Sequence, residues 1–329
     1  MTDAAATTSF SRRKLLAMGG GAVASGVLLS GGGLTLARDA AAAPAAPAGT
    51  VGSPPLSAAQ RQEIQAIIQV EGTYSNNVLN IQVDRDDVPD VTKDGVPIKP
   101  SFEINGNLCF QALPDGMVML NGDFSFKPEE LNPAIHQMVE HGLVWQAMHQ
   151  HLFGMQPMMW FEHFRGIGTA VKLAEACAAF IGVTSTPLPQ TLPKNPTTPL
   201  DVKRLEAILG GPGTVGSDGV VSFQFPPQQP IRLGGVYINS YLNIYSPIDF
   251  EPLGGSEAAV VPDFGQLASQ PDRLVSLMQA QGWEADCLYN QETDEDPQLY
   301  FSHYFKVGDA YELARQVRRG LEVSVSPPA

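Results

Sequence analysis

The chain has 329 residues, of which 20 are lysine or arginine and 34 are aspartate or glutamate, so its formal net charge is −14. This acidity excludes a nucleic-acid-binding protein that works through a broad basic surface. Three widely separated cysteines exclude a disulfide framework and a thiolate zinc site. Hydrophobic residues make up 43% of the chain, which is enough to bury one large core or two small ones.

The N-terminus has the layout of an export signal. Arg12 and Arg13 stand just before an uncharged stretch, 15–37, and alanine-rich sequence follows it. We therefore predict that residues 1–43 are a twin-arginine signal peptide recognised by the twin-arginine export machinery. Glycines dilute the apolar stretch, so we expect no permanent membrane span in the mature form, although a retained helix is the alternative. The predicted location is the periplasm, the cell envelope or the extracellular space.

The rest of the chain contains one unit twice. A shift of 140 residues aligns 94–176 with 234–316 without gaps and gives 17 identities in 83 positions. A period of this length indicates a duplicated domain. The predicted organisation, in chain order, is a flexible Ala/Pro-rich segment (44–55), a first domain (56–183), a Pro/Thr-rich linker (184–199), a second domain (200–322) and a tail (323–329).

The first unit mixes strand and helix patterns. In chain order we predict strands at 78–83, 108–113 and 117–126, a helix at 129–141, an antiparallel strand pair at 143–152 and 158–164, and a helix at 169–181. After the early strands the order is β-α-β-β-α. This order predicts an α+β fold: two duplicated, ferredoxin-like α/β sandwich units in which helices cover one face of an antiparallel sheet.

The predicted strand pair carries three histidines. His149 and His151 are two residues apart, so their side chains share one face of a strand, and His163 lies on the returning strand. Imidazole nitrogens from such positions can converge on one ion. Three histidines and an open fourth position are typical of an exchangeable or catalytic zinc, copper or iron site.

Ordinary structural roles compete with this interpretation. His-x-His occurs by chance on half-exposed strands, and the second unit has Tyr289, Gln291 and His303 at the three equivalent positions. The scaffold therefore does not need histidine at 149 and 151, whereas a structural role at 163 is as plausible as a ligand role. Glu130 could be a fourth ligand or a general base. Its alternative is a favourable interaction with the dipole of the following helix.

Other polar residues near the hairpin have simpler explanations. His136 and His141 fall on the polar side of the predicted helix, where we expect them to be solvated. Strand alternation should point Glu162 to the face opposite His163. The segment 290–296 is rich in acids but lacks the glycine and the terminal glutamate of an EF-hand loop, so we predict an acidic solvated loop.

Several segments resemble one known family. The stretch 147–152, then Pro157 and 160–163, together with 130–133 and 94–97, are similar to the LppY/LpqO family (domain of unknown function 1259) of exported bacterial proteins. The family's His-x-His and later histidine are matched here by His149, His151 and His163, although Gln150 replaces the usual asparagine. The resemblance implies export, a shared fold and a tandem arrangement. It implies no established activity.

The sequence leaves three functions open. The leading hypothesis is one transition-metal ion bound by the first domain through the three histidines, with Glu130 as an added ligand and a degenerate second copy. The same site could belong to a metal-dependent hydrolase, although no catalytic residue is identified. The main alternative is a metal-free module that binds a small ligand or an envelope component between the domains, lined by Trp145, Trp160, Tyr289 and Tyr300. A structural protein without a ligand is the third.

Overall fold

The computed structural model describes residues 53–328 and shows the same succession of elements twice. The predicted signal, with Arg12 and Arg13, lies outside these residues, and so does most of the predicted flexible segment 44–55. The described residues, which contain both repeats, belong to one compact unit. Within residues 53–328, none of the helices has the length and apolar character that crossing a membrane requires.

The first repeat builds a six-stranded antiparallel sheet in the order β1-β2-β5-β6-β9-β7 and a small sheet in the order β4-β3-β8. Its elements are α1 (Ala58–Ile68), β1 (Thr73–Ser75), β2 (Val78–Asp84), β3 (Thr92–Lys93), β4 (Val96–Pro97), α2 (Pro100–Glu103), β5 (Asn105–Ala112), β6 (Val118–Phe126), α3 (Leu131–Glu140), β7 (Val144–His149), β8 (Met155–Gln156), β9 (Trp160–Gly168) and α4 (Ala170–Ile181).

The second repeat has the matching sheets β10-β11-β14-β15-β18-β16 and β13-β12-β17. Its elements are α5 (Val202–Leu209), β10 (Gly213–Val215), β11 (Val221–Phe225), β12 (Ile231–Leu233), β13 (Val236–Ile238), β14 (Ser246–Gly254), β15 (Glu257–Leu267), α6 (Pro271–Ala280), β16 (Glu284–Ala285), β17 (Glu295–Asp296), β18 (Leu299–Asp309) and α7 (Ala310–Leu321). The α+β architecture of two duplicated units with antiparallel sheets is therefore confirmed.

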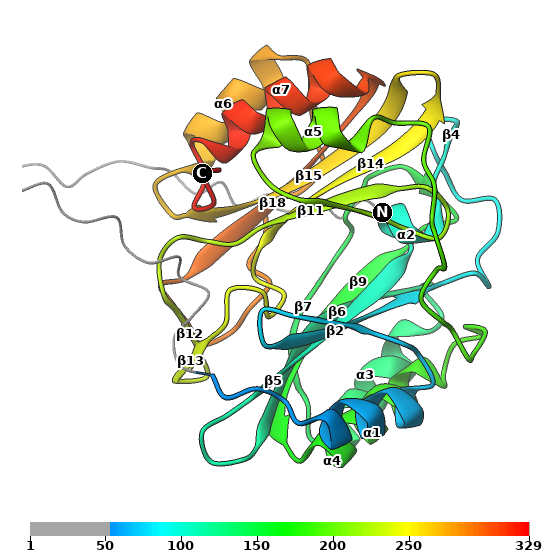
Figure 1. Cartoon of the computed structure of the whole chain (residues 1–329), viewed down its shortest axis with the longest axis vertical. Helices are drawn as coiled ribbons and strands as arrows, with labels where there is room; N and C mark the ends of the chain where they lie inside the picture. Colours follow the sequence, from blue (N-terminus) through cyan, green and yellow to red (C-terminus); the bar gives the residue numbers. More distant parts are fainter. Residues whose placement is uncertain (1–52, 329) are drawn as a thin grey trace, which may run out of the picture. The chain divides into compact units, whose positions relative to one another are not determined.

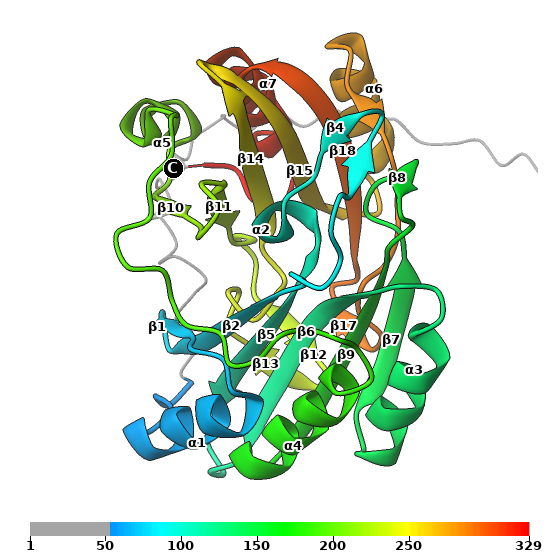
Figure 2. The same ribbon diagram turned by 90° about the vertical axis from the view of Figure 1, so that its right-hand side faces the viewer.

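Helices cover one face of each large sheet, as Figures 1 and 2 show for α1, α3 and α4 on the first repeat and α5, α6 and α7 on the second. Strand alternation explains the choice of face. In β6, Leu120 and Phe124 point into the core under the helices, where α3 contributes Met138 and α4 contributes Phe180. Residues of the other parity, such as Asp123, point to the helix-free face.

The small sheet of each repeat covers the helix-free face of the other repeat's large sheet. Ile231, Leu233 and Ile238 of the second repeat's small sheet pack against Cys109 and Met119 of the first repeat's large sheet. A reciprocal core joins first-repeat residues, among them Val91, Ile98 and Met155, to Ala259, Val261 and Phe305 of the second repeat. Because each small sheet packs on the helix-free face of the other repeat, these two faces lie together inside the molecule.

The predicted β-α-β-β-α order is observed as β6, α3, β7, β9 and α4. The predicted strand pair is also observed, with His149 opposite Phe161 and Ala147 opposite His163. The first of these strands, β7, ends at His149, three residues before the end of the predicted strand 143–152, so His151 lies outside it. The chain leaves the sheet there because β8 pairs with β3 instead, after a turn in which Gly154 adopts a φ of +74°.

Candidate metal centre

The three predicted histidines come together on the helix-free face of the first repeat. His149 is the last residue of β7, His151 lies in the bend that follows, and His163 lies in the middle of β9. They are 9%, 9% and 1% exposed, respectively. The neighbouring Glu162 faces the opposite way, as predicted, and accepts a hydrogen bond from Trp145. The hairpin thus delivers all three imidazoles to the interior between the repeats.

His149 and His163 contact each other directly. Their Nε2 atoms are 2.9 Å apart, and the Nδ1 of His149 lies 3.2 Å from the carbonyl oxygen of Gln150. Two nitrogens that bind one ion at about 2.1 Å lie roughly 3.0–3.4 Å apart. Burial lowers the pKa of His149 to about 3 and holds the pKa of His163 well below its usual value. Both rings are therefore neutral, which is the form that binds a metal.

His151 is oriented by a carboxyl group. Its Nδ1 lies 2.8 Å from Glu103 Oε2, and its ring stacks on Phe161 with the centroids 3.3 Å apart. Donation of a proton from Nδ1 to Glu103 leaves a lone pair on Nε2, and that atom is buried without a hydrogen-bond partner in the described part of the chain. Such a carboxylate–histidine pair is the usual outer support of a metal-binding histidine.

The second repeat contributes its own residues to the same place. His303, in β18, stacks on His151 with centroids 4.1 Å apart, and its Nδ1 lies 3.1 Å from Cys287 Sγ and 3.7 Å from Asp263 Oδ1. Tyr289 stacks on His149 with centroids 3.6 Å apart and donates a hydrogen bond to Asp263. The cluster is therefore shared by both copies of the duplicated unit.

A cavity of about 80 Å³ adjoins the cluster. His151 and His303 line it together with four carboxyl-bearing residues, Glu103, Asp123, Asp249 and Asp263. None of its lining residues is a lysine or an arginine. The exposed Gln82 and the half-buried Gln224 and Pro247 mark the side on which the cavity approaches the surface.

Burial dominates the electrostatics of this cavity. It raises the pKa of Asp123 to about 6, of Asp249 to about 7 and of Asp263 to about 8. Glu103 is raised well above its ordinary pKa, first by burial and then by repulsion from Asp249 and Asp263. The raised pKa values mean that burial favours the uncharged form of these carboxyl groups.

Three sets of side chains in the described chain could hold a metal ion, and each has its candidate ligand atoms within 4.8 Å of one another. They are the predicted set His149, His151 and His163, and two sets that mix the repeats, namely Glu103, His151 and His303, and His149, Cys287 and His303. All three sets belong to the one cluster at the meeting of the two sheets.

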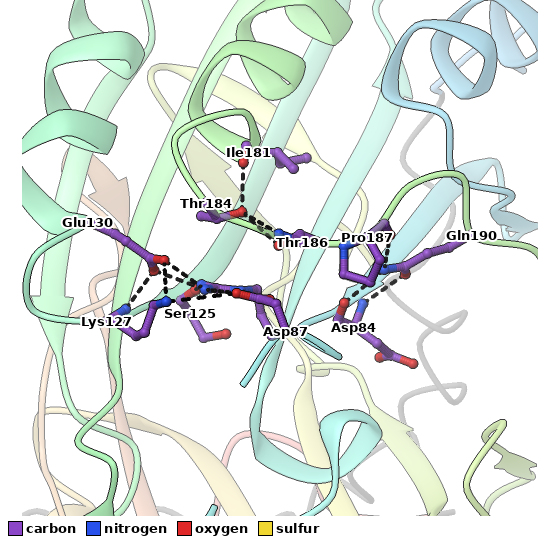
Figure 3. A network of polar contacts seen from close by, with 11 residues as sticks. Asp84, Asp87, Ser125, Lys127, Glu130, Ile181, Thr184, Thr186, Pro187 and Gln190 are labelled. Carbon is purple, nitrogen blue, oxygen red and sulfur yellow. Dashed lines mark hydrogen bonds and ion pairs between the residues drawn. The ribbon is translucent and has the colours of Figure 1, made fainter. Parts of the chain in front are cut away.

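Glu130 is not part of this cluster. Both of its carboxylate oxygens bond to the buried guanidinium of Arg85 at 2.9–3.0 Å, and Lys127 Nζ lies 3.1 Å away (Figure 3). It caps no backbone group of α3 with its side chain. The sequence placed Glu130 correctly at the start of the helix. Its partner is Arg85, which directly follows the last residue of β2.

The acidic segment 290–296 also differs from the prediction of a solvated loop. Glu292 is 2% exposed and accepts hydrogen bonds from Asn121, at 2.7 Å, and from Gln146 in the first repeat. Glu295 is 8% exposed and accepts the backbone N–H of Leu299. These acids are buried because the segment contains β17, which belongs to the small sheet that packs on the other repeat.

Of the four aromatic residues proposed for a binding surface, Tyr289 lines the cavity, whereas Trp145, Trp160 and Tyr300 do not. His136, on α3, and His141, the residue that follows the helix, are exposed, as predicted. The sequence reasoning missed Glu103, Asp263 and Cys287 and did not join His303 to the site. The signal for His303 and Asp263 was present, because the 140-residue shift aligns them with His163 and Asp123. Glu103 lies 48 residues before His151, and no local sequence pattern links the two residues.

Comparison with family models places both repeats in one family. The model described as Domain of Unknown Function (DUF1259) matches residues 62–182 and again 203–323. The chain belongs to this family, and the tandem arrangement expected from the sequence is confirmed. Neither the curated proteins nor the solved structures gave a match.

Proposed function

We propose that this protein binds a transition-metal ion through His149, His151 and His163 where the two repeats meet. The observation that carries the proposal is the convergence of three buried imidazoles, one of which has an Nε2 atom with no hydrogen-bond partner among the described residues. Burial keeps these rings neutral and so leaves lone pairs available for an ion. Zinc, copper and iron suit imidazole ligands.

The surroundings support an ion at this place. Glu103 selects the His151 tautomer with a free Nε2, and the Gln150 carbonyl does the same for His149. In the described chain, neither Glu103 nor the Gln150 carbonyl is paired with a lysine or an arginine. No lysine or arginine lines the adjoining cavity either. A divalent ion would supply positive charge beside carboxyl groups whose pKa values are raised by burial and mutual repulsion.

Metal content tests the proposal. The protein purified after export should carry zinc, copper or iron, and the double variant His149→Ala/His151→Ala should lose it to below about a tenth of an equivalent. The matched control is His136→Ala/His141→Ala, which removes two exposed histidines and should keep the metal. A wild-type protein that contains almost no metal and shows no rise in melting temperature when these ions are added would contradict the proposal.

A metal-dependent hydrolase is the second candidate, and the cavity beside the cluster is the observation that favours it. An ion with three histidine ligands has an open position, and zinc-bound water ionises near neutral pH. Asp263, with one buried oxygen that lacks a hydrogen-bond partner in the described chain, is positioned on the cavity wall to exchange a proton with that water. Hydrolysis of simple esters and phosphoesters by wild type but not by His163→Gln would support this activity, and equal rates would exclude it.

We also propose export by the twin-arginine machinery, on the strength of Arg12 and Arg13 before the apolar stretch. Replacement of both by lysine should retain the precursor inside the cell. Efficient export of that variant would show that another route is used.

A further inference from the structure

The three-histidine set is not the set that faces the cavity. His149 and His163 are absent from the cavity wall, whereas His151 and His303 line it together with Glu103. These three residues come from both repeats, are all buried, and offer ligand atoms within 4.8 Å of one another. Two histidines and one carboxylate, with the remaining positions open to a cavity, form a common metal-binding arrangement for zinc and iron.

His151 can serve both sets because its two nitrogens point to different places. Nδ1 lies 2.8 Å from Glu103 Oε2, so a small separation of the two groups would bring them to the roughly 3.0–3.4 Å of two ligands of one ion. Nε2 belongs to the same ring but is buried without a hydrogen-bond partner in the described chain. One imidazole can therefore bind an ion at each nitrogen once the proton on Nδ1 has been released.

The lining of the cavity offers oxygen ligands and no competing cation. Glu103, Asp123, Asp249 and Asp263 line it, and no basic side chain does. Asp263 Oδ1 is moreover buried without a hydrogen-bond partner in residues 53–328.

The carboxyl groups cannot hold the second ion by themselves. In the described chain, no three of them have oxygens close enough together to share one ion, since every candidate set contains at least two residues that are histidine or cysteine. The histidines are therefore needed. This requirement selects the set of Glu103, His151 and His303 rather than an oxygen-only site of the kind that calcium prefers.

We infer that a second divalent transition-metal ion binds Glu103, His151 and His303, with its open positions directed into the cavity and with His151 bridging it to the first ion. The inference rests on the proposed function, because the two ions share His151. Binding of the second ion displaces the Nδ1 proton of His151, which passes to solvent. On this basis the second repeat is part of the metal centre and not only a packing partner.

Zinc stoichiometry separates the two proposals. Metal-free full-length mature protein is loaded with zinc, passed through a desalting column and analysed for ions per chain. Wild type and the surface control His136→Gln should each retain two. Glu103→Gln and His303→Gln should retain one, and His163→Gln should retain one. A wild type that saturates at one ion overturns the inference but leaves the proposed function standing, and a wild type that binds none overturns both.

Copper loading tests the bridge in the unaltered protein, so it does not depend on whether a variant folds. Two Cu²⁺ ions joined by one imidazolate should couple magnetically, and the electron paramagnetic resonance signal per copper should fall well below that of isolated Cu²⁺. At least one proton should also be released when the second ion binds. Two copper ions that give the full, uncoupled signal would overturn the shared His151.

Discussion

In the centre of this protein, burial shifts the pKa of single side chains more than neighbouring charges do. Desolvation is the first cause of the lowered pKa of His149, His151, His163 and His303. It is equally the first cause of the raised pKa of Asp123, Asp249 and Asp263. Both changes favour neutral side chains in the metal-free state. A bound metal ion would reverse that preference for the carboxyls and would use the neutral form of the histidines.

The pH dependence of stability should show that His149 is buried in its neutral form. Its pKa in the folded, metal-free protein is about 3, below the value of about 6.5 in an unfolded chain. Its contribution to stability is therefore complete above pH 6.5 and is lost as the pH falls towards 3, because unfolding takes up a proton. His149→Gln should flatten the dependence of the unfolding free energy by about 1.4 kcal/mol per pH unit in that window.

Urea denaturation of metal-free protein at several pH values between 3.5 and 6.5, roughly the window set by the two pKa values, would measure the slope. His136→Gln is the control, since its exposed side chain stays in contact with water on folding. An identical slope in wild type and His149→Gln would show that His149 is not buried in the neutral form.

At the residue scale, the convergence of the three histidines was predictable but their partners were not. His149, His151 and His163 lie within 15 residues of one another in a single hairpin, so local spacing sufficed to bring them together. Glu130 was expected nearby because it starts the helix before the hairpin. It bonds to Arg85 instead, because a buried guanidinium so close to it needs a carboxylate partner.

At the scale of elements, the strands position the site through close backbone contacts. Gly122 lies in the middle of β6, next to Asp123, and a Cβ atom built there would be 2.2 Å from the carbonyl oxygen of Asn107 on the neighbouring strand β5. That atom belongs to the sheet backbone and cannot turn aside. The glycine therefore keeps β5 and β6 at their normal separation beneath the cavity.

We predict that Gly122→Ala destabilises the protein by about 2 kcal/mol or more, because the strands must separate to accept the methyl group. The melting temperature should fall by about 5 °C or more. Gly168→Ala, at the end of β9, is the matched control, because its Cβ would find its nearest neighbours at 3.6 Å. Calorimetry of both variants measures the difference, and equal melting temperatures would contradict the role given to Gly122.

Element types were predictable from the sequence, whereas some element ends were not. The helix patterns of α3 and α4 were found because apolar residues recur at helical spacing, and the termini agree within about two residues. β7 is shorter than predicted because β8 pairs with β3, which lies some 60 residues earlier. A two-residue strand has no sequence pattern of its own, since its pairing is decided by the partner.

At the scale of the whole molecule, the repeats depend on each other. Two of the four hydrophobic clusters formed by the described residues contain side chains from both repeats. Lys93 of the first repeat, 1% exposed, forms ion pairs with Glu284 and Asp286 of the second. Neither large sheet would have a covered second face without the other repeat. The folded state should therefore form and melt as one cooperative unit.

Tryptophan fluorescence can test this cooperativity. Trp145 and Trp160 report on the first repeat, and Trp283 reports on the second. Trp283→Phe and Trp145→Phe/Trp160→Phe should each unfold in a single transition, and within each variant the fluorescence midpoint should coincide with the midpoint measured by far-ultraviolet circular dichroism. A fluorescence transition well separated from the global one would show that the repeats unfold independently.

The duplication, the α+β composition and the three-histidine hairpin followed from the sequence alone, because each depends on residues that are close together in the chain or repeated at a fixed spacing. Only the tertiary structure decided that Glu103 and His303 stand beside His151, and that four carboxyl groups surround one cavity. These neighbours are brought together by the exchange of small sheets between the repeats. That exchange depends on packing across the whole chain, and no local pattern records it.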